Sequence, residues 1–275
     1  MKETEQEYAK KSFDDVASKY DEIPFFKISA KHVVDIIHKH KNEDSLEILD
    51  VACGTGNVVL ECATCMSGAN FDAVDISEGM LAKAKENAET QNIGNVEFKS
   101  QDITHMKLAK KYDVITCSYA LFFLPDAHNV LGTLVSLLKM DGIVIFTSFT
   151  AKAFSTSNEI LLPLLRKYGS KTAIEYDIDK WENLKQVKDI EHLCILAEVN
   201  TPEIQSKSIR YGMSLDEWWE LLNNTGYKGM LMELNLEDYE RVKNEYYEAM
   251  YKYADMDGEV ELVADSYFST VQKMN

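Results

Sequence analysis

Residues 47–57 read Glu47-Ile48-Leu49-Asp50-Val51-Ala52-Cys53-Gly54-Thr55-Gly56-Asn57, a short apolar run that leads into a turn with two glycines. The run predicts a buried strand, and the apolar residues after Asn57 predict a helix. Because glycine lacks a Cβ, such a turn lets the backbone come close to a ligand. A second strand-like run, Phe71-Asp72-Ala73-Val74-Asp75, ends in an acid that can accept hydrogen bonds from both ribose hydroxyls. Together they predict a nucleoside-binding unit.

The glycine turn departs from two other nucleotide-binding patterns. A dinucleotide fingerprint has a third small residue where this chain has Val59, which is expected to disfavour a close pyrophosphate site. No phosphate-binding loop ending in Gly-Lys-Ser or Gly-Lys-Thr is present. An ordinary strand-to-helix turn is the alternative interpretation. The acid Asp75, nineteen residues after Gly56, favours the nucleoside ligand.

Strand and helix patterns alternate along the first 150 residues. The expected strands are 46–51, 71–75, 95–99, 112–117 and 142–149, and the expected helices between them are 57–66, 78–91 and 127–138. Ser77 is a suitable N-cap for the second of these helices. This alternation predicts an α/β fold whose parallel sheet is covered on both faces.

The pattern changes after Thr150. The expected helices there are 156–168, 178–187, 189–198 and 236–254, and the expected strands are 204–211 and 259–271. Ser214 and Glu217 form a capping-box pattern that opens a further helix. That helix carries Trp218 and Trp219, which point about 100° apart, so one ring is expected in the core and the other half exposed.

Two helices are expected before the first strand. Residues 3–20 and 28–40 have helical periodicity, and Pro24 is expected to end the first of these helices.

Five motifs in order resemble those of the class I S-adenosylmethionine-dependent methyltransferases. They are residues 49–56 (motif I), 75–81, 98–103, 112–121 and 138–146, the last with Met140-Asp141 where Pro-Gly is usual. The segment Phe13-Asp14-x-Val16-Ala17-x-x-Tyr20-Asp21 resembles the start of the ubiquinone- and menaquinone-biosynthesis branch. The resemblance covers residues 13–149, and the remainder of the chain resembles the family less clearly.

The resemblance implies a Rossmann-like, seven-stranded, mostly parallel sheet with an antiparallel last strand and helical cap insertions. The implied parts are N-terminal helices over the site (1–45), a cofactor-binding core (46–150), a helical insertion (151–188) and the end of the sheet (189–275) with a helical cap at 212–257. The cap is expected to cover the carboxyl ends of the strands, where open α/β sheets bind ligands.

The resemblance also implies how motif I meets the cofactor. The backbone at Ala52, Cys53, Gly54 and Gly56 is expected to approach the methionine part, and Asp50 to orient the turn or meet the amino group.

Other positions are implied to hold the nucleoside. Asp75 is expected to bind the ribose hydroxyls, with Ile76 and Met80 flanking the adenine. Asp102 is expected to bond the adenine amino group, with Ile103 beside the ring.

The methyl donor is implied to lie between two further parts of the chain. Ser118 and Tyr119 are expected to border it, and Tyr20 to close over the cofactor.

The sequence does not identify a catalytic base. The weak candidates are His128, Tyr119 and Tyr211, and for His128 the ordinary alternative is a surface or helix-start residue. The positions expected to contact the acceptor are Tyr119, Arg210, Tyr211, Trp218 and Lys228, of which the two cations could meet an anion. Transfer from a sulfonium needs alignment more than a base, and alignment alone can supply about 7–11 kcal/mol.

Composition limits the remaining possibilities. The 275 residues carry a net charge of −17 and are 45% hydrophobic, with no apolar run long enough to span a membrane. Nucleic acid and anionic membranes are therefore not expected partners. The five cysteines and the polar N-terminus predict reduced thiols and a cytoplasmic location, and Cys62 and Cys65 are expected to pack rather than bind metal.

The sequence thus predicts a methyltransferase that uses S-adenosylmethionine, releases S-adenosylhomocysteine and acts on a small molecule, without a metal, as a monomer or homodimer. Two alternatives remain open. One is an NAD-dependent oxidoreductase, which shares the acid after the second strand. The other is a non-catalytic nucleoside-binding partner protein.

Overall fold

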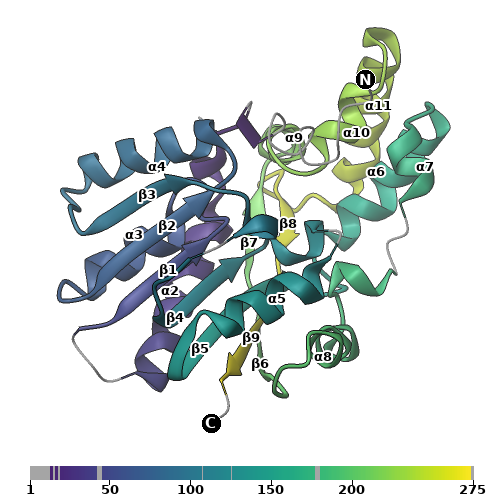
Figure 1. Cartoon of the computed structure of the whole chain (residues 1–275). Helices are drawn as coiled ribbons and strands as arrows, with labels where there is room; N and C mark the ends of the chain where they lie inside the picture. The colour runs from purple at the N-terminus through teal and green to yellow at the C-terminus, as the bar shows by residue number, and fades with distance from the viewer. Residues whose placement is uncertain are drawn as a thin grey trace, which may run out of the picture. The chain divides into compact units, whose positions relative to one another are not determined.

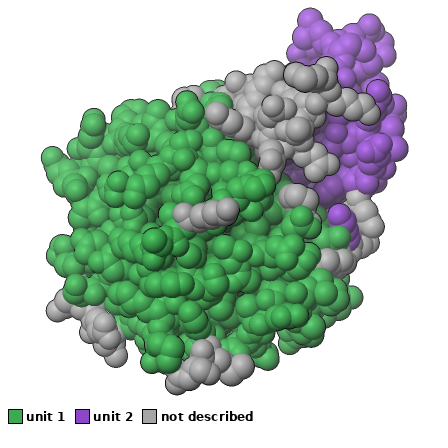
Figure 2. Space-filling model, in the orientation of Figure 1, with its two compact units in different colours: residues 1–150, 181–207, 266–275 green, residues 151–180, 208–265 purple. Residues whose placement is uncertain are grey.

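The computed structural model describes residues 13–14, 16–17, 19–41, 45–106, 108–124, 126–176 and 180–273. The chain folds into two compact units (Figure 2). Residues 1–150, 181–207 and 266–275 make up the first unit, and residues 151–180 and 208–265 the second. The second unit is therefore built from two insertions into the chain of the first.

A seven-stranded sheet forms the centre of the first unit (Figure 1). Its strands are β1 (Glu47–Val51), β2 (Asn70–Asp75), β3 (Val96–Ser100), β4 (Tyr112–Ser118), β5 (Leu138–Phe149), β6 (Glu203–Lys207) and β9 (Ser266–Gln272), in the order β3-β2-β1-β4-β5-β9-β6. Strands β1 to β5 are parallel, and β9 runs antiparallel to both of its neighbours. The predicted Rossmann-like fold class is confirmed.

Helices cover both faces of this sheet. Helices α2 (Pro24–His40), α3 (Asn57–Cys65) and α4 (Glu78–Thr90) pack on one apolar cluster, and α5 (Ala127–Ser136) and α8 (Val187–Leu196) pack on the other. Strand residues alternate between the two clusters, so the central strands are buried on both sides. This burial explains why they read as nearly continuous apolar runs in the sequence. None of the helices in the described ranges has the length and apolarity to cross a bilayer.

The second unit combines helices with a small sheet. Its helices are α6 (Ser155–Lys167), α7 (Lys171–Glu175), α9 (Leu215–Asn223), α10 (Lys228–Met232) and α11 (Leu236–Met250), and its antiparallel strands are β7 (Arg210–Met213) and β8 (Val260–Val263). Side-chain hydrogen bonds connect segments of this unit that are far apart in the sequence. Tyr246 shares a 2.9 Å hydrogen bond with Ser157, and Tyr227 donates to Asn158 at 2.7 Å.

Two predicted strands each prove to be two strands. The predicted strand 204–211 divides into β6 and β7, and the predicted strand 259–271 divides into β8 and β9, with the halves in different sheets. Asp265 explains the break. Its carboxylate accepts hydrogen bonds from Ser208 Oγ and Ile209 N, which lie between β6 and β7. The Ile209 N–H is therefore not available for strand pairing where the chain passes from one sheet to the other.

Two helix predictions also need correction. The prediction of a helix at 178–187 is wrong in its described part, because Leu184 has a φ of +52° and a capping box between Gln186 and Asp189 starts α8 afresh. Pro24 begins α2 instead of ending the preceding segment, since proline fits the first helical turn. Most of the helix predicted at 3–20 lies outside the described residues.

Both tryptophans of α9 are buried, contrary to the expectation that one would be half exposed. Trp218 is 1% exposed and donates from Nε1 to the carbonyl of Val260. Trp219 is 5% exposed and contacts the rings of Tyr239 and Tyr246. Helix α9 is therefore covered on two faces, by β8 and by α11.

A paired substitution in β5 tests this account of the core. Ile145 is fully buried, whereas Met140 in the same strand is 63% exposed. We expect Ile145→Ala to lower the free energy of unfolding by about 2–5 kcal/mol. Met140→Ala should change it by less than about 0.5 kcal/mol. Urea denaturation measures both values, and equal effects would contradict the assignment of the core.

Candidate functional site

Two adjoining cavities lie in the first unit where the parallel strands end at their carboxyl edge. The larger has a volume of about 350 Å³ and the smaller of about 50 Å³. Both are bordered by Tyr20, Ala52, Gly54, Ser118 and Tyr119. Open α/β sheets bind ligands at this edge, so the cavities are the candidate site.

The glycine turn between β1 and α3 forms one wall through its backbone. Ala52, Gly54 and Gly56 all have positive φ, of 51°, 55° and 86°. A Cβ on Gly54 would meet nothing within 4 Å, so the space above it is open. Gly56 has a different role: it borders neither cavity, and a Cβ there would lie 3.2 Å from Leu60. The predicted close approach of backbone to ligand thus concerns Gly54 and its neighbours.

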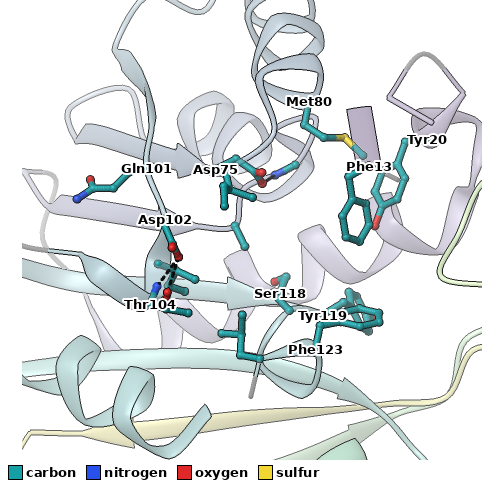
Figure 3. A pocket seen from close by; sticks show the side chains of 16 residues that line it. Phe13, Tyr20, Asp75, Met80, Gln101, Asp102, Thr104, Ser118, Tyr119 and Phe123 are labelled. Atoms are coloured by element: carbon teal, nitrogen blue, oxygen red, sulfur yellow. Dashed lines mark hydrogen bonds between the residues drawn. The ribbon is translucent and has the colours of Figure 1, made fainter. Parts of the chain in front are cut away.

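Asp75, at the end of β2, faces the larger cavity (Figure 3). Its Oδ2 accepts from Gly54 N at 2.8 Å and its Oδ1 from Ser77 N at 2.9 Å. Burial raises the pKa of Asp75, and the hydrogen bonds from Ser77 and Gly54 oppose that rise. Each carboxylate oxygen can still accept a further hydrogen bond, which suits two neighbouring hydroxyl groups.

Asp50 and Ser118 line the smaller cavity with polar atoms that lack partners. Asp50 Oδ1 accepts from Thr116 Oγ1 at 2.6 Å. Asp50 Oδ2 and Ser118 Oγ are buried and have no hydrogen-bond partner in the described part of the chain. Burial raises the pKa of Asp50 to about 7, against the opposing effects of Thr116 and the Val59 N–H. A buried carboxylate of this kind is complementary to a small cation.

The loop after β3 borders one end of the larger cavity (Figure 3). Asp102 Oδ1 accepts from Thr104 N at 2.8 Å, and Oδ2 lies 2.9 Å from His105 Nδ1. Burial acts to raise the pKa of Asp102, but the hydrogen bonds from His105 and Thr104 outweigh it, so the pKa is lowered. Gln101 and Thr104 also line this end, and sequence reasoning did not single them out.

Aromatic rings form the side opposite Gln101 and Asp102. Tyr20 stacks on Phe26 with ring centroids 4.5 Å apart, and Phe13 meets Phe123 edge-on at 6.2 Å. Burial, and then the charge of Asp75, raise the pKa of Tyr20. Sequence reasoning did not assign Phe13 or Phe123 to the site, although Phe13 belongs to the motif that contains Tyr20.

Tyr119 forms a rigid wall of both cavities. It has a φ of +53° and stacks on Phe149 at 4.5 Å. Its hydroxyl lies 2.8 Å from both Ser29 Oγ and Ser266 Oγ, and burial raises the pKa of Tyr119 to about 12. A hydroxyl held in this way is poorly suited to accept a proton at neutral pH.

The other predicted residues divide by location. Met80, Ile76 and Ile103 line the larger cavity, and Cys53 lines the smaller one. His128 is half-buried on α5 and borders neither cavity, so the structure gives this candidate base no access to them.

Four predicted acceptor contacts belong to the second unit. Trp218 is part of its core, and Arg210 bonds Asp265 at 3.0 Å and Glu261 at 3.4 Å. Tyr211 lies in β7, and Lys228 begins α10. Their contact with an acceptor stays a prediction.

All charged side chains that line the two cavities in the described residues are acidic. They are Asp50, Asp75 and Asp102, and no lysine, arginine or histidine accompanies them. The site therefore favours a ligand with positive charge. Over the described ranges no three His, Cys, Asp or Glu side chains are grouped to hold a metal ion, and of the free cysteines only Cys65 is exposed.

The description "Methyltransferase domain" belongs to a family model that matches residues 42–212. The chain belongs to this family. The match confirms the resemblance to the S-adenosylmethionine-dependent methyltransferases, and with it the enzyme class.

Relatives agree with this assignment. The chain is 27% identical over 216 residues to malonyl-[acyl-carrier protein] O-methyltransferase of Bacillus anthracis, covering 78% of this chain and 77% of that protein. It is 29% identical to aklanonic acid methyltransferase DauC of Streptomyces sp. (strain C5), covering 56% and 71%. Matches to three further malonyl-[acyl-carrier protein] O-methyltransferases span only 53%, 39% and 58% of those proteins.

A solved structure supports the fold over nearly the whole chain. Magnesium protoporphyrin IX methyltransferase of Synechocystis PCC 6803, with bound SAM, superposes with a TM-score of 0.54 at 16% identity. The alignment covers 98% of both chains.

The raised pKa of Asp50 predicts a cost to stability. Its folded pKa of about 7 exceeds the ordinary aspartate value of 3.8, so stability falls as pH rises between these values and stays reduced above them. We expect Asp50→Asn to raise the free energy of unfolding at pH 8 by about 1–3 kcal/mol, an advantage lost below pH 4. Denaturation without ligand at both pH values measures it. Asp35→Asn is the control, because the Asp35 side chain is 76% exposed. A less stable Asp50→Asn protein at pH 8 would contradict this account.

Proposed function

We propose that the two cavities bind S-adenosylmethionine and that the enzyme transfers its methyl group in line to a small-molecule acceptor. The observation that carries this proposal is a buried, partnerless Asp50 oxygen in the same site as Asp75 and the open backbone at Gly54. A ligand with an ammonium group, a ribose and a sulfonium matches these three features. When bound, the sulfonium supplies the methyl group and makes a neutral leaving group.

The described residues divide the work of holding this cofactor. Asp75 binds the ribose hydroxyls, and Asp50 and Ser118 receive the amino group in the smaller cavity. Asp102 and Gln101 lie at the far end, where the adenine edge needs hydrogen-bond partners. Tyr20 and Tyr119 exclude water from the methyl group between them, and exclusion of water strengthens the acidic groups' hold on the cation.

The charge of the cavities argues against NAD. A pyrophosphate would bring two negative charges among three carboxylates, without a lining cation to offset them. Val59 is buried in the core at the position of the third glycine. The non-catalytic alternative predicts the same cofactor binding without turnover, so a turnover assay separates it from the enzyme.

The cavity walls favour an acceptor that is ionised on its own. The described lining residues include no histidine, lysine or glutamate, and the three lining aspartates are assigned to the cofactor. Burial raises the pKa of both lining tyrosines. Alignment can still drive transfer to an anionic nucleophile such as a carboxylate, whose charge the sulfonium of the bound cofactor would offset among the acidic lining residues. Support comes from two relatives, whose names give malonyl-[acyl-carrier protein] and aklanonic acid as their acceptors. We propose that this chain methylates a carboxylate of a compact acid.

The net charge of −17 supports a free metabolite over a nucleic acid as the acceptor. We further propose that the enzyme works in the cytoplasm as a monomer or homodimer.

Asp75→Ala tests the cofactor assignment. Loss of a charged hydrogen-bond acceptor from the ribose site should weaken S-adenosylhomocysteine binding about 10- to 100-fold by calorimetry. In thermal-shift assays the wild-type protein should be stabilised by S-adenosylmethionine and S-adenosylhomocysteine but not by NAD. Asp35→Ala serves as the exposed control. Unchanged affinity of Asp75→Ala would remove the assignment, and stabilisation by NAD alone would favour the oxidoreductase.

A pH profile tests the nature of the acceptor. With methyl-labelled cofactor and a panel of carboxylic acids, phenols, amines and thiols, we expect labelled methyl esters. The ratio kcat/KM should be half-maximal near pH 7 as Asp50 ionises, level off by about pH 8 and then stay level to pH 9. A continued rise above pH 8, or methylation of amines alone, would count against an acceptor that is ionised without the enzyme's help.

A further inference from the structure

Two aspartates of the segment at residues 13–22, here called the strap, hold the two loops that the proposed function assigns to the cofactor. Residues 15 and 18 of the strap are outside the described ranges. Asp14 and Asp21 lie seven positions apart, as do Phe13 and Tyr20. The two aromatic side chains line the larger cavity, whereas the two carboxylates bond neighbouring loops.

Asp14 binds the turn that follows Asp75. Its Oδ1 accepts from Ser77 Oγ at 2.5 Å and from Gly79 N at 2.9 Å. Ser77 in turn accepts from Met80 N and caps α4, and Met80 packs against Val16 and Ala17 of the strap. The strap is therefore part of the N-terminal cap of α4.

Asp21 binds the glycine turn. Its carboxylate accepts three hydrogen bonds, from Thr55 Oγ1 (2.5 Å), Asn57 Nδ2 (3.2 Å) and Asn87 Nδ2 (2.6 Å). Asn87 also donates to the carbonyl of Thr55 at 3.1 Å. Asp21 thus joins the strap, the turn after β1 and helix α4 at one point.

The strap and α4 approach each other closely at Gly79. A Cβ at Gly79 would lie 3.1 Å from both Asp14 Cα and Asp14 Oδ1. These contacts include backbone, so the strap would have to move to admit a methyl group. Gly94, by contrast, has open space around its Cβ position and no positive φ.

We infer that Asp14, Asp21 and Gly79 are positioning residues. They hold the strap against the glycine turn and α4, so that Phe13 and Tyr20 retain the bound cofactor. The inference rests on the proposed function, because it takes the cofactor to occupy the two cavities. None of the three positioning residues lines a cavity, so they act through the aromatic side chains and the loops they bond. Their loss should raise the rate at which the cofactor leaves, without removing a group that touches it.

Gly79→Ala is the sharpest test, with Gly94→Ala as its matched control. Alanine favours a helix over glycine, so α4 itself should not be weakened. We expect Gly79→Ala to bind S-adenosylhomocysteine about tenfold more weakly by calorimetry. The melting temperature without ligand should fall by no more than about a few degrees, because the gain in helix propensity offsets part of the lost strap contacts. Gly94→Ala should match the wild type in both measurements.

Limited trypsin digestion adds a readout that a purely structural role would not change. Lys19 lies exposed on the strap. S-adenosylhomocysteine should protect the bond after Lys19 in the wild type and in Gly94→Ala, but not in Gly79→Ala. Asp21→Asn should behave as Gly79→Ala, because an amide would face the donors of Asn57 and Asn87; Asp35→Asn is its control.

Three results would overturn the inference. One is wild-type affinity and protection in Gly79→Ala and Asp21→Asn. Another is a loss of affinity matched by a large fall in the melting temperature without ligand, which would indicate a structural role only. The third, no binding of S-adenosylhomocysteine by the wild type, would overturn the proposed function as well, and so is distinguishable from failure of the strap alone.

Discussion

The hydrogen bond from Gly54 N to Asp75 Oδ2 ties together the ends of β1 and β2, and the rest of the site depends on it. It places a carboxylate beside bare backbone at the edge of the sheet. The positive φ of Gly54 is required for this arrangement, since a side chain there would be strained and would enter the space above the turn. The ribose assignment and the open space above the turn both depend on this connection.

Burial of acids is the energetic feature that most affects function. Asp50 lacks a partner for one oxygen, and Asp75 is also buried, so the protein without ligand carries unfavourable charge. A ligand that carries a cationic group would offset this cost, and a ligand without one would not. The two buried acids lower the stability of the folded protein at the place where a cation is to bind, which is a common pattern in functional sites. The acidity of the whole chain, in contrast, is explained by solubility alone.

The strap connects a sequence motif to a physical role. In the motif, two aromatics and two aspartates repeat at a spacing of seven, and in the structure the aromatics face the cavity while the aspartates face the loops. Asp14 accepts hydrogen bonds from the turn after Asp75, and Asp21 accepts three hydrogen bonds at the glycine turn and α4. A segment remote in sequence from the sheet thus contributes to the shape of the site through hydrogen bonds to charged groups, which are stronger than neutral ones.

Local pattern was sufficient to predict most of the first unit. The strands and helices from 46 to 149 can be predicted because central parallel strands are largely apolar, and the N-cap Ser77 marks the start of α4. The acid at 75 and the glycine at 54 could be assigned from spacing, since a strand, a tight turn and a helix leave few ways to arrange their ends. The pairing of distant segments could not be predicted. Nothing local shows that Asp265 divides two strands, that Gly79 admits the strap, or that Asp50 is left with a partnerless oxygen. Those features arise from contacts between residues far apart in the chain, and only the folded backbone brings them within hydrogen-bonding distance.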